Sequence, residues 1–174
     1  MTISAQSIGK FLALPLVVGV VLVFWFWHPT KLSFVPSSIG SLNLQEVISG
    51  SQAQQILNAM HDKSVTPASS QIGRYRGTEG EAALYVSAYG SVSEASEAGL
   101  KMRRRIDDGN TIFSHVREVS LGGKNITMCL GLGQAHYFFS EDERLYWLAV
   151  DPGLAHKSIV AVFQFVRSQA GKGP

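Results

Sequence analysis

An uncharged, strongly apolar run near the N-terminus constrains this chain more than any other feature. Residues Phe11 to Trp27 read FLALPLVVGVVLVFWFW, seventeen residues without a charge. A helix of that length spans about 25 Å, close to the shortest that crosses a hydrocarbon core of about 30 Å. Aromatic residues gather at one end, where rings sit well at the level of lipid headgroups. The run predicts a single transmembrane anchor that includes Phe11, Leu16, Val20, Phe24, Trp25, Phe26 and Trp27.

A cleaved signal peptide is the alternative interpretation of this run. The sequence after it, WHPTKLSFVP, has no small-x-small cleavage site, and the run is longer than a usual signal-peptide core. We therefore expect the anchor to be retained. Positive charge is nearly balanced, with Lys10 before the run and Lys31 after it, so the positive-inside bias is slight. The predicted orientation places the short N-terminal tail inside and the following domain outside, which is the periplasmic side of a bacterial inner membrane.

The rest of the 174-residue chain is long enough for one ordinary domain and too short for two. A single cysteine excludes an internal disulfide framework and every zinc or iron–sulfur pattern that needs several cysteines. The formal net charge of +2 indicates no nucleic-acid partner. The five histidines show no metal-ligand spacing. We expect no cofactor, no metal and no catalytic residue, and membrane lipid and other protein subunits as partners.

Hydrophobic periodicity predicts an α+β domain over residues 40–170, preceded by the tail and anchor (1–29) and a tether (30–39) and followed by a tail (171–174). The expected sheet is mostly antiparallel, with helices packed on one face. A capping box of Ser91 and Glu94 indicates where the middle helix begins. The expected helices cover residues 44–60, 93–106 and 154–168; the clearest strands cover 82–89, 111–121, 125–130 and 145–150.

The hairpin that follows residue 125 can be registered from its pattern. If Leu130 pairs with Ala135, then Met128 faces Tyr137, and one side of the hairpin is continuously apolar. The same register places Cys129 directly opposite His136, with their Cβ atoms about 5 Å apart. A thiol beside an imidazole is how proteins make a reactive thiolate. Because no third group is evident, we favour a small buried thiol, with a reactive pair as the alternative.

One stretch concentrates positive charge: Lys101, Arg103, Arg104 and Arg105. Such a run most often forms the solvated face of a helix, here supported by Glu97 four residues before Lys101. The functional alternative is contact with anionic lipid headgroups or with an acidic partner subunit.

A succession of short segments, SIGSLNL, LYVSAY, SVSEASEAG, GGKNIT and QAHYFF, lies between Ser38 and Val150. It resembles a group of uncharacterised bacterial membrane-anchored or exported α+β domains. A second resemblance is to exosortase-associated domains, whose cysteine–histidine pattern is not matched here. The resemblance implies an exported domain and no activity.

These features predict a non-enzymatic accessory or structural subunit of a larger membrane complex, respiratory or photosynthetic for example. The helix would pack within the membrane, and the domain would brace the complex from the periplasmic side. A different class is a membrane-anchored domain that binds a small molecule or another exported protein. A pocket ringed by Tyr85, Tyr137 or Trp147 would favour that second class. An enzyme built on Cys129 is the third.

Overall fold

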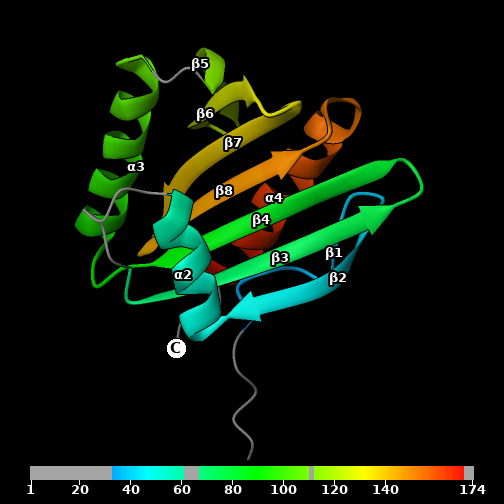
Figure 1. The fold of residues 1–174 in the computed structure, drawn as a ribbon, viewed down its shortest axis with the longest axis horizontal. Coiled ribbons are helices and arrows are strands. Elements are labelled where there is room, and N and C mark those ends of the chain that lie inside the picture. The colour runs from blue at the N-terminus through cyan, green and yellow to red at the C-terminus, as the bar shows by residue number, and fades with distance from the viewer. Residues whose placement is uncertain (1–32, 61–66, 110–111, 171–174) are drawn as a thin grey trace, which may run out of the picture. The chain divides into compact units, whose positions relative to one another are not determined.

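The computed structural model describes residues 33–60, 67–109 and 112–170, and Figure 1 shows their arrangement. By its contacts the chain divides into Met1–Ser33 and Phe34–Pro174. The predicted anchor and the C-terminal tail lie outside the described residues. Within the described ranges, none of the helices has both the length and the apolar character needed to cross a bilayer.

The domain is built on an eight-stranded antiparallel sheet, which confirms the α+β class. The strand order across the sheet is β1-β2-β3-β4-β8-β7-β6-β5. Strands that are consecutive in the chain pair with each other, except β4 and β5; β4 pairs with β8 instead. Most pairings are therefore hairpins. The strands are β1 (Ser38–Ile39), β2 (Leu42–Ser49), β3 (Ser69–Gly77), β4 (Gly80–Ala88), β5 (Phe113–Leu121), β6 (Lys124–Gly131), β7 (Gln134–Glu141) and β8 (Arg144–Val150).

Helices lie on both faces of this sheet, so the prediction that they pack on one face is wrong. Helix α4 (Ala155–Ala170), which follows a short 3₁₀ turn η1 (Pro152–Leu154), lies behind the sheet as drawn in Figure 1. Helices α2 (Gly50–Met60) and α3 (Val92–Asp107) lie in front of it. The physical reason is visible in β8, whose residues from Leu145 to Val150 are all buried. A strand that is apolar at every position needs cover on both sides.

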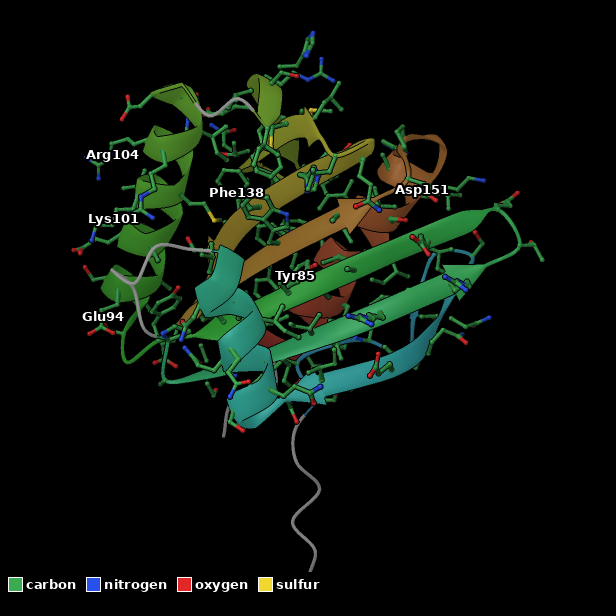
Figure 2. The ribbon with its side chains drawn as sticks, in the orientation of Figure 1. Tyr85, Glu94, Lys101, Arg104, Phe138 and Asp151 are labelled. Carbon is green, nitrogen blue, oxygen red and sulfur yellow. The ribbon has the colours of Figure 1, made fainter. Side chains whose placement is uncertain are left out.

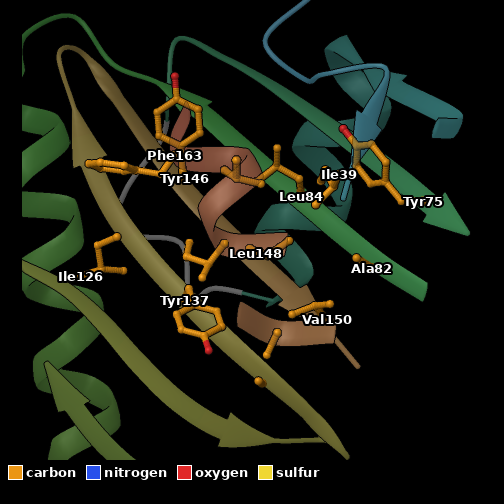
Figure 3. Packing of buried hydrophobic residues seen from close by; sticks show 14 of the residues in the cluster. Ile39, Tyr75, Ala82, Leu84, Ile126, Tyr137, Tyr146, Leu148, Val150 and Phe163 are labelled. Atoms are coloured by element: carbon orange, nitrogen blue, oxygen red, sulfur yellow. The ribbon is translucent and has the colours of Figure 1, made fainter. Parts of the chain in front are cut away.

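The α4 face carries the larger core. Leu84, Val86, Leu148 and Val150 alternate with residues of the opposite face and pack with Val162 of α4. Figure 3 shows this cluster, which also takes in Ile39, Tyr75, Ala82, Ile126, Tyr137, Tyr146 and Phe163.

The α2 and α3 face carries two smaller cores. Under α3, Ile106 packs with Cys129, Phe138, Trp147 and Ala149. Under α2, the buried residues are Ile48, Ala53 and Ile72.

The helix predicted over residues 44–60 is wrong in its first third. Residues Leu42–Ser49 form strand β2, and only Gly50–Met60 are helical. Apolar Leu44, Val47 and Ile48 fit helical spacing, but β3 offers a pairing partner, and a bulge after Leu44 readjusts the register. Gly50 has φ +64°, a left-handed conformation that glycine adopts without strain, and this residue turns the strand into the helix.

Other local predictions are confirmed. Helix α3 begins after Ser91, whose hydroxyl accepts a hydrogen bond from the Glu94 backbone N–H at 3.2 Å. The β6–β7 register is as expected at Leu130–Ala135 and Met128–Tyr137.

The start of the domain overlaps the predicted tether. The domain begins at Phe34, and Val35 and Ile39 are buried in the α4-face core. The Tyr75 hydroxyl donates a buried hydrogen bond of 2.9 Å to the carbonyl oxygen of Pro36. Residues 34–39 are therefore bound to the sheet.

Candidate functional site

The predicted Cys129–His136 pair exists. The two residues are opposite each other in the β6–β7 ladder, with side chains on the α3 side of the sheet. Cys129 is fully buried, and burial raises the pKa of its thiol to about 11. A thiol in such surroundings stays protonated near neutral pH and is a poor nucleophile.

Both ring nitrogens of His136 are engaged. Nδ1 accepts a hydrogen bond from Trp147 Nε1 at 3.0 Å, and Nε2 lies 2.9 Å from the carbonyl oxygen of Gly131. Since indole N–H is only a donor and a carbonyl is only an acceptor, the ring is the neutral tautomer with hydrogen on Nε2. Burial lowers the pKa of His136, partly offset by the Gly131 contact.

Aromatic rings enclose this histidine. Phe113 of β5 meets it edge-on with centroids 5.0 Å apart, and Trp147 does so at 5.6 Å. Phe138 stacks on Trp147 at 5.2 Å. Sequence reasoning did not identify Phe113 and Trp147 as neighbours of His136. The position of Trp147 could have been predicted. When the β6–β7 register is extended to the next strand, β8, Trp147 pairs with Phe138, two residues along β7 from His136.

The arrangement favours the structural alternative for this pair. No hydrogen bond joins His136 to the thiol, because its two nitrogens already bond Trp147 and Gly131. A neutral imidazole with its acceptor nitrogen occupied cannot take a proton from Cys129. The two side chains are a buried packing contact on the α3 side of the sheet.

The basic run divides into two groups. Arg103 is half-buried and forms ion pairs with Asp107, at 3.5 Å, and with Glu118 of β5. It therefore links α3 to the sheet edge. Lys101, Arg104 and Arg105 are exposed, and Figure 2 shows Lys101 and Arg104 on the outer side of α3. These three remain candidates for contact with lipid or with a partner.

A further surface lies on the front of the sheet, where neither α2 nor α3 covers it. Here Arg74 pairs with Glu46 at 3.4 Å, and Arg76 pairs with Glu81 at 2.9 Å, all four side chains being exposed. Half-buried Tyr85 lies at the border of this surface (Figure 2), where it packs against the clusters under α2 and α3. Burial raises its pKa, and the charge of nearby Arg74 lowers it in part. We name Glu46, Arg74, Arg76, Glu81 and Tyr85 the uncovered sheet face.

Of the three aromatic residues named for a pocket, Tyr85 and Trp147 are directly opposite each other in the β4–β8 ladder, and Tyr137 lies apart from them. Tyr137 packs in the α4-face core, whereas Tyr85 and Trp147 lie on the opposite face of the sheet. Trp147 is packed beneath α3 and only 8% exposed. The three rings therefore cannot line one pocket together, because the sheet separates Tyr137 from the other two.

Metal ligands do not cluster in the part of the chain that the structure describes, where no three His, Cys, Asp or Glu residues are placed to hold an ion. No protein-family model, curated protein or solved structure matches the chain.

Proposed function

We propose that this protein is a single-pass membrane protein whose domain serves as a non-enzymatic accessory or structural subunit of a larger membrane complex, on the periplasmic side of a bacterial inner membrane. The observation that carries the proposal is the uncharged run from Phe11 to Trp27. Its length and apolar character suit a membrane anchor, and a small domain follows it in the chain. A respiratory or photosynthetic assembly is an example of such a complex.

The chemistry of the domain supports a binding role over a catalytic one. Its single cysteine is buried and protonated, and the histidine opposite is held neutral by Trp147 and Gly131. The uncovered sheet face carries two exposed ion pairs, Arg74–Glu46 and Arg76–Glu81, which suit recognition of another charged protein surface.

Two surfaces compete as the contact with the complex. The uncovered sheet face offers Arg76 and also Arg74, which lies near half-buried Tyr85 at its border. Aromatic and arginine side chains dominate binding energy at protein interfaces. The outer side of α3 offers Lys101 and Arg104, without an aromatic neighbour among the residues that line it. The uncovered sheet face is therefore our preferred contact.

Extraction of native membranes in a mild detergent tests this function. Native electrophoresis followed by mass spectrometry should find stoichiometric companion subunits. Arg74→Glu should reduce their recovery at least several-fold, whereas the matched reversal Lys101→Glu should leave it unchanged. A chain that runs alone would contradict the subunit proposal, and loss only with Lys101→Glu would move the contact to α3.

A second candidate is an anchored domain that binds a small molecule or another exported protein. Tyr85 favours it, because a half-buried ring beside an arginine suits an anionic aromatic or sugar-like ligand. Native mass spectrometry of the purified full chain distinguishes the two, since a retained small molecule supports this candidate and companion subunits support the first.

A further inference from the structure

His136 sits in a hydrogen-bonded arrangement that tolerates only one protonation state. Its Nδ1 has a hydrogen-bond donor, Trp147 Nε1, at 3.0 Å. A proton added at Nδ1 would place two N–H groups against each other, because indole nitrogen cannot accept. The other nitrogen is already committed to the Gly131 carbonyl.

The surroundings of the ring give a positive charge little compensation. Phe113 and Trp147 meet it edge to face, and Met102 and Ile106 of α3 belong to the same apolar cluster. The titratable groups of that cluster are the Cys129 thiol from β6 and the Tyr85 hydroxyl from β4.

The charged groups of α3 and β5, the elements that pack near His136, contact other residues or are exposed to solvent. Arg103 of α3 pairs with Glu118 of β5, and Arg117 of β5 acts on Tyr137 of the opposite face. His115 of β5 is exposed and bonded to the Ser114 hydroxyl at 2.9 Å.

The element most easily displaced is the Phe113 end of β5. As the last strand of the sheet, β5 has one neighbour, and its ladder is interrupted between Ser114 and Arg117. His115, inside that interruption, has φ +55°, which is strained for a residue with a side chain. The Phe113 ring packs closely on Gly131, so close that a Cβ at Gly131 would lie 2.4 Å from it.

We propose that His136 is a built-in acid-sensitive switch: protonation of Nδ1 breaks the bond to Trp147, frees the Phe113 end of β5, and uncovers the Cys129 thiol. The fall in the pKa of His136 on burial agrees with this direction. The open form binds a proton with the ordinary histidine pKa of about 6.5, so acid below that value favours opening. This device is independent of the membrane proposal.

The single cysteine reports the opening directly. The full chain in detergent is mixed with 4,4′-dithiodipyridine between pH 7.5 and pH 4.5, and the rate is divided by that of free cysteine at the same pH. We expect the normalised rate to rise on the order of tenfold between pH 6.5 and pH 5, because opening is coupled to uptake of one proton. Far-UV circular dichroism should stay unchanged, since the opening is local.

Variants separate His136 from other causes. His136→Gln should abolish the rise, whereas His115→Gln, a matched change at an exposed histidine on β5, should preserve it. Should His136→Gln not fold, Trp147→Phe removes the opposing donor and should reduce the rise. A rise that survives in His136→Gln, or one that is not reduced in Trp147→Phe, overturns the switch, as does a flat profile in the unchanged protein. Acid exposure of the thiol together with loss of the circular dichroism signal also overturns it.

Discussion

The two faces of the sheet are covered in different ways. On the α4 face, a single continuous core includes residues from Val35 near the start of the domain to Val166 of α4. On the other face, α2 and α3 cover separate clusters, and charged residues such as Arg74 and Glu81 occupy the uncovered remainder. The first face is built for stability. The second combines a marginal core with exposed polar surface, which is where binding and local opening are expected.

The largest effect should come from emptying the continuous core. Leu148→Ala removes a side chain that is 1% exposed and should lower the free energy of unfolding by about 3 kcal/mol. Ile72→Ala, in the small cluster under α2, should cost about 2 kcal/mol because fewer buried neighbours surround the cavity. Denaturant titration of the full chain in detergent measures both, and equal losses would break the comparison.

The cysteine under α3 should react slowly at alkaline pH. Because its thiol pKa rises from 9.0 to about 11, the thiolate fraction at pH 8 should be about 100-fold below that of an unperturbed thiol. Because the folded protein favours the protonated thiol, the raised pKa of Cys129 adds to the free energy of unfolding. That contribution is fully present below pH 9 and is lost as the pH rises toward 11. Iodoacetamide alkylation at pH 8 checks the prediction. A rate equal to that of free cysteine would show that the α3 face is open at rest.

A smaller effect should follow from removing the helix cap on the same face. Ser91→Ala deletes the acceptor for the Glu94 N–H and should destabilise the protein by about 1 kcal/mol. The matched change Ser96→Ala, at an exposed position inside α3, should cost nothing measurable. Thermal or chemical denaturation distinguishes them. Equal values would mean that α3 docks independently of its cap.

The smallest effect should come from the uncovered sheet face. A double-mutant cycle with Arg74→Ala and Glu46→Ala should return a coupling of a few tenths of a kcal/mol, because both side chains are more than half exposed. Denaturant titration of the four proteins supplies the coupling energy. A coupling well above 1 kcal/mol would show that this pair is a structural element, which would weaken the case for a binding surface.

Local patterns predicted much of the fold. Ser91 and Glu94 located the start of α3, and alternation around Leu130 and Ala135 predicted the β6–β7 register, including the opposition of Cys129 and His136. These predictions succeeded because hydrogen bonds to the cap and a period of two depend only on near neighbours. The Phe11–Trp27 anchor lies outside the described residues and stays a prediction.

Errors arose where distant parts of the chain decided the outcome. Leu44, Val47 and Ile48 suit a helix or a strand, and β3 as a partner selected the strand. The basic run was predicted as one surface, yet Glu118 of β5 takes Arg103 out of it. Neither effect has a signal in the neighbouring residues.

By itself, the sequence determined the class of the domain, the middle and final helices, and the pairing of Cys129 with His136, because local hydrogen bonds and apolar alternation specify them. Only the tertiary structure decided that helices cover both faces, that Trp147 donates to His136, and that Arg74 lies near Tyr85 at the border of the uncovered sheet face. The reason is that packing and long-range hydrogen bonds depend on which strands become neighbours, and the β4–β8 contact joins strands far apart in the chain.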